Sequence, residues 1–357
     1  MTEFGRYFVP GPVEVHPDVL AALTRPVIPH RSAETEELFR RTQPGLQAVF
    51  GTTRPVYVLT SSGTAVVEAG LRALPRGKVL ALVNGAFSQR FERIARECGH
   101  DVDVTGVDWG EVHDPAAVAE AARGGGYRAV TVAHSETSTG ALQPIAEIAR
   151  ALGDVPLLVD SVSGAGGVAV DMDAAGLGYA CTGAQKALAL PPGLGFAVLS
   201  EKMLQDAPQA PARGYYLDLL RYEKDQPPFT PAISLIFALA VQLERMEKEG
   251  LRARFARHQA MAERTWEWVE SAGERIGVAL EVLAPAGKRS PTVTCVKLPA
   301  GRSGPDAVRR IAERGYTVGG GYASLRETTF RIGHMGEQTL ATLEGLLAAC
   351  DEALAAA

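Results

Sequence analysis

The sequence predicts an α/β protein with a mostly parallel central sheet covered by helices on both faces, plus a smaller C-terminal α+β domain. Two observations carry this prediction. Through the first two-thirds of the chain, short apolar runs alternate with stretches that begin at proline or a polar residue and stop at glycine, as strands and helices do. After Pro231 the pattern changes to two long helical stretches and then to strands mixed with helices. A chain of 357 residues is long enough for two such domains.

The first part of the chain contains seven expected strands. They are short and mostly apolar, as strands buried on both faces are, and they lie at 56–59, 78–83, 101–105, 128–133, 156–159, 179–181 and 196–199. Helices are expected between them at 64–73, 87–98 and 144–152. Gly99 and Gly153 follow two of these helices and are typical of helix ends. Strands separated by helices pair in parallel, which gives the central sheet.

The second part begins with two helical stretches, at 232–249 and 251–272, that are broken at Gly250. The first begins apolar and ends charged, as expected of a helix that leaves the core of one domain for another. Further strands are expected at 278–283, 292–298 and 328–332, with helices at 305–314 and from 337 onward. We therefore expect a large domain at 16–248 and a small domain at 249–357, the latter completed by the N-terminal segment 1–15.

Composition and charge exclude several classes of function. The net charge is −5, so no basic surface for nucleic acid or an anionic membrane is expected. No apolar run reaches the roughly 18 residues that a membrane span needs, and the start of the chain does not resemble a signal peptide. Four cysteines occur far apart and form no C-x-x-C motif: Cys98, Cys181, Cys295 and Cys350. We read them as reduced and mostly structural, which is typical of a cytoplasmic protein.

Lys186 is the most unusual residue of the sequence. Small and apolar residues surround it in the stretch 182–188, whereas a surface lysine has polar neighbours. In a dry environment an ammonium loses its proton more readily, and the amine can then attack a carbonyl. Asp160 ends an apolar strand, where a carboxylate is costly unless it is paired; the alternative is an aspartate that caps a turn. A buried lysine and an aspartate are the minimum set for pyridoxal phosphate, which needs a Schiff-base amine and a carboxylate at its ring nitrogen.

Other strand ends carry residues that suit the same cofactor. Ser62, Gly63 and Thr64 begin a helix, where hydroxyls and free N–H groups favour a phosphate. Such residues also serve as ordinary helix caps, so this signal is weak when taken alone. Phe87 follows the next strand and can stack on a flat ring, or pack in the core instead. Val162 would then pack on the opposite face of that ring.

Two residues further along the chain complete the set. In the polar run 134–140 we favour Thr137 as the partner of the cofactor's phenolic oxygen, with a solvated turn as the alternative. Arg331 stands in an apolar strand near two glycines, and its planar fork suits the α-carboxylate of an amino acid. The alternative for Arg331 is a structural ion pair. The sequence has no P-loop, no G-x-G-x-x-G, no G-x-S-x-G and no histidine pair at metal-ligand spacing.

Taken together, the ordered motifs resemble the class V aminotransferases of the fold-type I pyridoxal-phosphate superfamily, and most closely the alanine–glyoxylate/serine–pyruvate branch. The resemblance covers nearly the whole chain. It rests on Pro10-Gly11-Pro12, His30-Arg31-Ser32, Ser62-Gly63-Thr64, Asn84-Gly85-x-Phe87, His134-x-Glu136-x-Ser138-Thr139-Gly140, Asp160-Ser161-Val162-Ser163, Gln185-Lys186-Ala187, Pro191-Pro192-Gly193, Thr230-Pro231 and Phe330-Arg331-Ile332-Gly333-His334-Met335-Gly336.

The resemblance implies a role for each residue. Lys186 is expected to form the Schiff base and Asp160 to pair with the pyridine nitrogen of the ring, which Val162 and Phe87 would sandwich. The phosphate would be held by Ser62, Gly63, Thr64 and Gln185. Thr230 is expected to reach the phosphate of a neighbouring subunit, which implies a homodimer with shared sites. Arg331 would bind the substrate carboxylate, with Gly11 lining the same pocket. One departure is that many relatives carry tryptophan where Phe87 stands.

The activity implied is a ping-pong transamination from a small amino acid, of the alanine or serine type, to a 2-oxo acid such as glyoxylate or pyruvate. A family member with an acidic or phosphorylated donor (aspartate, phosphoserine or an aminophosphonate) is the main alternative. Such a donor needs an extra cation, for which Arg31 and Arg213 are candidates. A lyase or desulfurase shares the fold. A desulfurase would need a cysteine on a mobile active-site loop, but Cys295 and Cys350 fall in expected regular elements. A non-catalytic binding or assembly subunit is the remaining alternative.

Overall fold

The computed structural model describes residues 4–224 and 226–355. Its largest sheet has seven strands in the order β2 (Tyr57–Thr60), β10 (Leu194–Leu199), β9 (Tyr179–Gly183), β8 (Leu157–Asp160), β5 (Tyr127–Ala133), β3 (Lys78–Val83) and β4 (Asp101–Gly106). Strand β10 runs antiparallel to both of its neighbours, and the other pairs are parallel. The prediction of a mostly parallel central sheet is therefore confirmed, and each expected strand lies within three residues of its predicted bounds.

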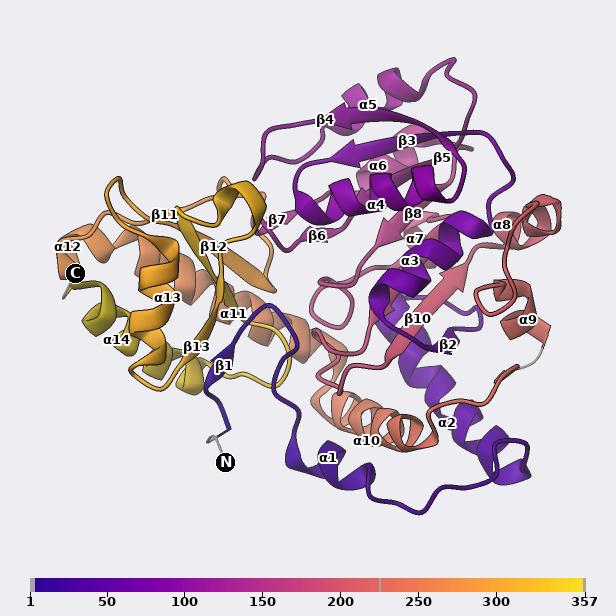
Figure 1. Cartoon of the computed structure of the whole chain (residues 1–357), viewed down its shortest axis with the longest axis horizontal. Coiled ribbons are helices and arrows are strands. Elements are labelled where there is room, and N and C mark those ends of the chain that lie inside the picture. Colours follow the sequence, from indigo (N-terminus) through magenta and orange to yellow (C-terminus); the bar gives the residue numbers. More distant parts are fainter. Residues whose placement is uncertain (1–3, 225, 356–357) are drawn as a thin grey trace.

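Helices cover both faces of this sheet (Figure 1). They are α1 (Pro17–Ala22), α2 (Ala33–Phe50), α3 (Gly63–Arg72), α4 (Ala86–Glu97), α5 (Pro115–Ala122), α6 (Ile145–Leu152), α7 (Met172–Ala175), α8 (Glu201–Asp206), α9 (Leu219–Lys224) and α10 (Ile233–Glu249). Alternate strand residues belong to two separate cores: Val58 packs with α2, α6 and α10, and its neighbour Leu59 packs with α3 and α4. Side chains of a strand point to opposite faces in turn, so the two cores lie on opposite faces.

A second sheet of five strands forms a smaller layer. Its order is β1 (Tyr7–Phe8), β13 (Thr317–Gly320), β14 (Thr329–Gly333), β12 (Val293–Lys297) and β11 (Glu281–Val282). The helices α11 (Leu251–Glu270), α12 (Ala272–Ile276), α13 (Gly304–Ala312) and α14 (Leu340–Ala355) pack with it around a third core. The pairing of β1 with β13 places the N-terminal segment on this smaller sheet. Two short strands, β6 (Ser135–Glu136) and β7 (Ala141–Leu142), form a separate hairpin.

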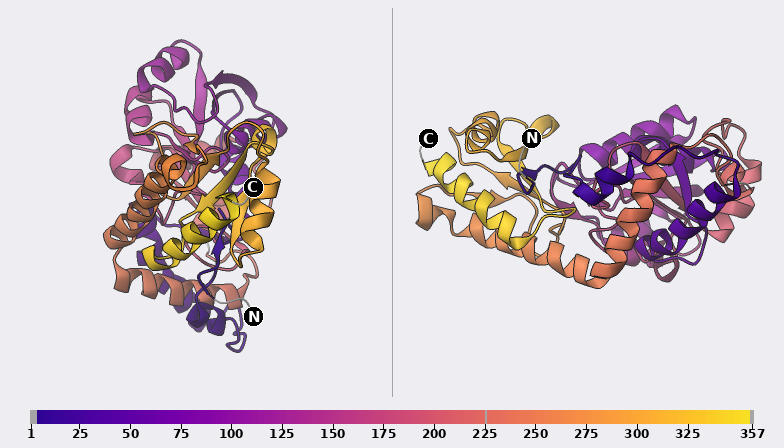
Figure 2. Two further views of the ribbon diagram at one scale, coloured as in Figure 1. Left: turned by 90° about the vertical axis from the view of Figure 1, so that its left-hand side faces the viewer. Right: turned by 90° about the horizontal axis from the view of Figure 1, so that it is seen from below.

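Helices α10 and α11 run from the large sheet to the small one (Figure 2). Gly250 separates them and has a φ of +81°, a conformation that glycine adopts without strain. The predicted domain boundary at 248/249 falls at this break, and the exact division stays a prediction. None of the helices in residues 4–224 and 226–355 combines the length and the apolar character needed to cross a membrane.

Several elements were not expected from the sequence. Helix α2 contains Pro44 and Gly45, which are typical of helix breaks, yet the helix continues through both. Strand β13 contains Gly319 and Gly320, which are weak strand formers. The expected strand at 278–283 is reduced to the two residues of β11, and the last helix begins at Leu340 rather than 337.

Candidate active site

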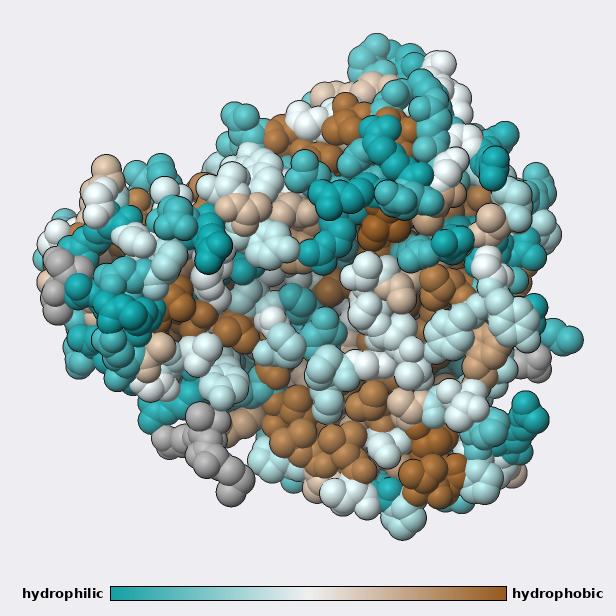
Figure 3. Space-filling view, in the orientation of Figure 1, coloured by the Kyte–Doolittle hydropathy of each residue, from teal (hydrophilic) through white to brown (hydrophobic). Residues whose placement is uncertain are grey.

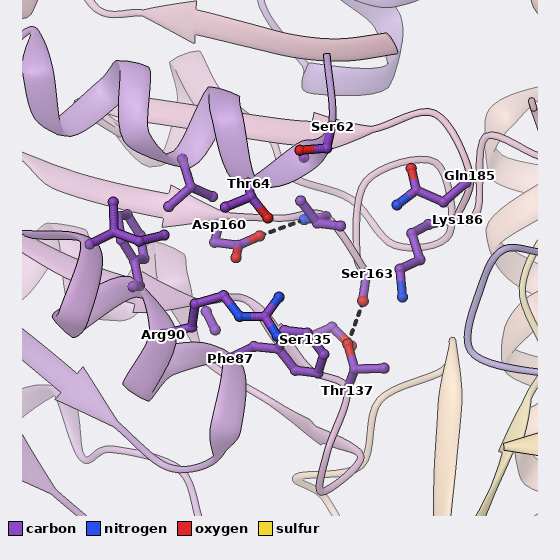
Figure 4. A pocket seen from close by; sticks show the side chains of 16 residues that line it. Ser62, Thr64, Phe87, Arg90, Ser135, Thr137, Asp160, Ser163, Gln185 and Lys186 are labelled. Atoms are coloured by element: carbon purple, nitrogen blue, oxygen red, sulfur yellow. Dashed lines mark hydrogen bonds between the residues drawn. The ribbon is translucent and has the colours of Figure 1, made fainter. Parts of the chain in front are cut away.

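A pocket lies at the edge of the large sheet where β2, β3, β5, β8 and β9 end, the usual place for ligands of parallel sheets. The pocket brings together most of the residues singled out from the sequence (Figure 4). Those predicted residues are Ser62, Gly63, Thr64, Phe87, Thr137, Asp160, Val162, Gln185 and Lys186. The lining also includes residues that were not predicted, namely Val67, Arg90, Phe91, Ile94, Ala133, Ser135 and Ser163.

Lys186 follows β9 and points into the pocket (Figure 4). Its Nζ donates a hydrogen bond to the carbonyl oxygen of Pro10. Gly11 lies against its aliphatic chain, because a Cβ at Gly11 would overlap the Lys186 side chain and would lie 3.0 Å from the Gln185 carbonyl oxygen. Burial lowers the pKa of Lys186 to about 8, and the charge of Arg331 acts in the same direction. About a tenth of this amine is therefore uncharged at pH 7, far more than for an ordinary lysine.

Asp160 is the last residue of β8 and lines the pocket. Its Oδ1 accepts one hydrogen bond, 2.9 Å long, from the backbone N–H of Val162. Burial raises the pKa of Asp160 to about 6, and the negative charge of Glu136 also contributes. The carboxylate thus keeps most of its acceptor capacity available for a group inside the pocket.

Helix α3 points its N-terminus at the pocket. Its N-cap residue Ser62 is exposed and makes no side-chain capping bond to the described backbone. Thr64 is likewise exposed. A Cβ on Gly63 would lie 2.9 Å from Cγ2 of Val162, so glycine is needed for the close approach of these two walls. The open helix start, with two hydroxyls beside it, provides hydrogen-bond donors suited to an anion.

Glu136 is a buried carboxylate beside the pocket whose importance was missed in the sequence. It accepts hydrogen bonds from the backbone N–H groups of Phe87, Ser88 and Ser138, at 2.9–3.3 Å. The hydroxyls of Ser88 and Ser138 also donate to it, at 3.0 and 2.6 Å. Glu136 therefore caps the start of α4 and fixes the backbone that carries Phe87. The signal available in the sequence was an acid within an otherwise uncharged polar run at a strand end.

Arg331, in β14 of the smaller sheet, contacts Thr137, which lies in the loop between β6 and β7. Nη1 of Arg331 donates to the Thr137 carbonyl oxygen at 3.1 Å, and its Nε donates to the Gly320 carbonyl oxygen at 2.8 Å. Arg331 forms no ion pair with a carboxylate of residues 4–224 or 226–355, so the structural ion pair considered for it is wrong. The Thr137 hydroxyl lies in the pocket and hydrogen-bonds to the Ser163 hydroxyl (Figure 4).

Arg90 and Tyr322 form a second contact between the large and small parts of the molecule. Nη2 of Arg90 donates to the Tyr322 hydroxyl at 3.0 Å. The Tyr322 ring is stacked on Phe87, with 5.3 Å between centroids and 30° between planes. The guanidinium carbons of Arg90 and Arg331 lie 4.8 Å from the Phe87 ring centroid and 5.6 Å from the Tyr322 centroid, respectively.

The remaining candidates lie away from the pocket. Thr230 is exposed and borders a separate surface hollow with residues 27–30. Arg213 donates to Asp218 at 3.0 Å and also to three backbone carbonyls, so its guanidinium is already engaged. Arg31 is exposed and does not line the pocket. The structure therefore offers neither arginine as a cation for an acidic donor within this chain's pocket.

The residues present fit pyridoxal phosphate. The pocket provides an amine with a lowered pKa in Lys186 and, across from it, a carboxylate with spare acceptor capacity in Asp160. The open start of α3 suits a phosphate group, and Gln185 lines the same part of the pocket. Phe87 and Val162 provide apolar surfaces for a flat ring. The amine, the carboxylate and the helix start match the aldehyde, pyridine and phosphate parts of the cofactor, respectively.

Comparisons with known proteins identify the family of the chain. The model of the family described as aminotransferase class-V matches residues 14–331. An uncharacterised aminotransferase of Methanocaldococcus jannaschii is 38% identical over 352 residues, which cover 94% of this chain and 90% of the relative.

Two solved structures are also similar. An alanine–glyoxylate aminotransferase from Nostoc sp. has a TM-score of 0.91 at 30% identity and covers 99% of this chain and 96% of its own. An aspartate aminotransferase of subgroup IV from Thermus thermophilus has a TM-score of 0.88 at 34% identity, with 98% and 99% covered. The chain therefore belongs to the class-V aminotransferases, pyridoxal-phosphate-dependent transaminases of fold type I.

Proposed function

We propose that this transaminase moves an amino group from a small amino acid, of the alanine or serine type, to a 2-oxo acid such as glyoxylate or pyruvate. The observation that carries the proposal is that Lys186 and Asp160 line one pocket. The similarity to an alanine–glyoxylate aminotransferase over nearly the whole chain supports it.

When bound, pyridoxal phosphate supplies an electron sink for negative charge at the α-carbon of the donor. Lys186 would hold the cofactor through its amine. With a pKa of about 8, the same amine can take the α-proton of the donor and return it to a neighbouring carbon. Asp160 would keep a proton on the ring nitrogen by accepting a charge-assisted hydrogen bond from it.

Other residues would position the cofactor and the donor. We propose that Ser62, Gly63 and Thr64, with Gln185, bind the phosphate, since α3 points its uncapped start at this place. Phe87 and Val162 would hold the ring between them, and the Thr137 hydroxyl would face its phenolic oxygen.

We propose that Arg331 binds the donor's carboxylate, beside Gly11, which packs on Lys186. Two N–H groups of the Arg331 guanidinium already donate to backbone carbonyls, which fixes its orientation. An arginine held in this way is pre-organised for a planar anion, because fewer rotamers are lost on binding.

A homodimer with shared sites is part of the proposal. Hydrophobic residues gather on the face where Figure 1 places α1 and α10 (Figure 3). Val27 there is 74% exposed, and Ile28, Pro231 and Ile233 line the hollow that Thr230 borders. Burying this surface against a second copy would bring Thr230 to the other subunit. We also propose a cytoplasmic location, supported by four cysteines that are free of disulfides.

The desulfurase alternative gains no support from the cysteines. Cys295 lies in β12 and Cys350 in α14, and both are buried. Burial raises the pKa of Cys295 to about 11, which disfavours the thiolate that would act as nucleophile.

The test mixes holoenzyme with a panel of L-amino acids and follows the cofactor's absorbance as it converts to the amine form. We expect conversion by alanine or serine, recovery of the original spectrum on adding glyoxylate or pyruvate, and loss of both in Lys186→Ala. The matched control is Lys202→Ala, which removes an exposed lysine on α8 that pairs with Asp206. Turnover retained in Lys186→Ala would refute the assignment, and conversion by none of the amino acids would favour a non-catalytic binding role.

A further inference from the structure

Arg90 is an exposed cation that lines the pocket from helix α4 (Figure 4). Within residues 4–224 and 226–355, its one hydrogen bond goes to the uncharged Tyr322 hydroxyl, through Nη2. No carboxylate of residues 4–224 or 226–355 lies within ion-pair distance of it. A guanidinium carries five N–H donors, so most of those on Arg90 remain available to a ligand in the pocket.

The charges around the pocket leave Arg90 without an assigned partner. Glu136 is saturated by amides and hydroxyls, and Asp160 lies where the ring nitrogen is proposed to bind. The proposed phosphate site at Ser62 and Gln185 lies on the side of the pocket away from Arg90 (Figure 4). The donor's α-carboxylate is assigned to Arg331. A second anionic group on the donor would provide the missing partner for Arg90.

Tyr322 places the two arginines on either side of a single side chain. Its hydroxyl accepts from Arg90, and its ring lies 5.6 Å from the Arg331 guanidinium carbon. The ring also stacks on Phe87, so it has little freedom to turn. Tyr322 therefore contacts both cations and links the positions of their guanidinium groups.

We propose that Arg90, held by Tyr322, is a specificity-determining residue that binds the side-chain carboxylate of a small dicarboxylic amino donor such as aspartate. This inference rests on the proposed transaminase function and extends its donor class. It also replaces Arg31 and Arg213, the cations suggested by the sequence, with a residue that the fold brings into the pocket. Charge-assisted hydrogen bonds from a planar guanidinium to a carboxylate are among the strongest side-chain contacts available for such selectivity.

The experiment compares L-aspartate with L-asparagine, which match in size and differ in charge. Holoenzyme is mixed with each donor in a stopped-flow instrument, and the rate constant of cofactor conversion divided by the apparent donor dissociation constant is measured. We expect the aspartate/asparagine ratio to fall about 10- to 100-fold in Arg90→Gln, the size of one or two lost charge-assisted hydrogen bonds. Arg90→Lys should recover part of the ratio, because it keeps the charge and loses the fork.

Two further variants separate specificity from folding. Arg93→Gln removes a positive charge from an exposed position on the same helix that does not line the pocket, and should change the ratio less than about twofold, as expected for a screened surface charge. Tyr322→Phe keeps the stacked ring but removes the hydroxyl that holds Arg90, and should lower the ratio by about 2- to 10-fold, the size of one lost neutral hydrogen bond.

The outcomes are distinct for this inference and for the proposed function. Equal losses toward aspartate and asparagine in Arg90→Gln would overturn the specificity role. Conversion of alanine by the wild-type enzyme without any conversion of aspartate would also overturn it, and would leave the transaminase function in place. Failure of every amino acid, including alanine, would instead sink the proposed function itself.

Discussion

The N-termini of α3 and α4 both face the pocket, but only that of α4 is capped by a side chain of the described residues. At the start of α4, Glu136 accepts hydrogen bonds from three backbone N–H groups and two hydroxyls. At the start of α3, Ser62 makes no side-chain capping bond to the described backbone. Asp160 resembles the second case, with one protein donor for its carboxylate. We call Glu136 and the start of α4 the closed side of the pocket. We call Ser62–Thr64 and Asp160 the open side.

The difference separates structural polar groups from groups kept for a ligand. A buried polar group costs free energy unless it is bonded, so the closed side satisfies its bonds within the chain. On the open side, part of the hydrogen-bonding capacity has no partner among the described residues. This lowers the stability of the protein without its ligand, as is common at active sites. Variants of the closed side should therefore change folding, and variants of the open side should change cofactor binding.

The largest effect is expected from Glu136→Ala on the closed side. Three backbone N–H groups and two hydroxyls would lose their acceptor, so the free energy of unfolding of the apo-protein should fall by about 3 kcal/mol or more. Urea unfolding followed by circular dichroism measures it. The control is Glu111→Gln, which breaks an exposed ion pair with Lys288 and should cost less than about 1 kcal/mol. Equal stability of the two variants would show that Glu136 does not hold the closed side together.

Asp160→Asn on the open side should stabilise the apo-protein. The folded state raises the pKa of Asp160 from 3.8 to about 6, mainly through burial, so the native state binds more protons than the unfolded state between these values. Wild-type stability therefore loses this contribution as pH rises through that window, and the loss is complete above pH 6. The rise in pKa corresponds to at most about 3 kcal/mol, and solvent that reaches the carboxylate through the pocket reduces it to about 1–3 kcal/mol.

The pH dependence supplies the check on this prediction. Because asparagine has no charge to desolvate, the variant should exceed the wild type in unfolding free energy at pH 8, and the gap should narrow toward pH 4. Holoenzyme measurements should show the reverse, since the proposed partner of the ring nitrogen is gone. A variant that is less stable than the wild type at pH 8 would mean that Asp160 already has all the partners it needs.

Ser62→Ala should affect binding and leave folding alone. An N-cap serine that bonds its helix typically contributes about 0.5–2 kcal/mol, but Ser62 is exposed and makes no such bond, so unfolding of the apo-protein should change by less than about 0.5 kcal/mol. The dissociation constant for pyridoxal phosphate, followed by fluorescence, should rise about 5- to 10-fold through loss of one hydroxyl donor. A loss of stability without a loss of affinity would place Ser62 on the closed side instead.

The sequence predicted what depends on local pattern. Lys186 among small residues and Asp160 at the end of an apolar strand are visible within a few positions, and the strands of the large sheet follow from short apolar runs. Helix α2 was missed because Pro44-Gly45 indicates a break, and only its packing on the core, with Leu46 fully buried, overrides that local preference.

Long-range contacts could not be predicted in the same way. Glu136 acts on Phe87 across 49 positions, and Arg90 meets Tyr322 across 232, so neither partnership leaves a local signature. Arg213, a candidate cation, turned out to be engaged by Asp218 and nearby carbonyls. The proposed role of Thr230 depends on a second subunit, which the sequence of one chain does not place. These residues show that a motif locates a site more readily than it identifies the groups that support it.

The smallest effect is expected at Phe87, which joins the two sides. Its backbone is fixed by Glu136 on the closed side, while its ring lines the pocket. Phe87→Trp should lower the dissociation constant for pyridoxal phosphate about two- to fivefold, because an indole offers a larger stacking surface and an N–H donor. The unfolding free energy of the apo-protein should change by less than about 1 kcal/mol, because the hydrogen bond from the backbone to Glu136 is kept and the ring is only half-buried. Weaker cofactor binding in this variant would mean that Tyr322, which stacks on the ring at position 87, leaves no room for a larger side chain. The closed side would then constrain the ring of this residue as well as its backbone.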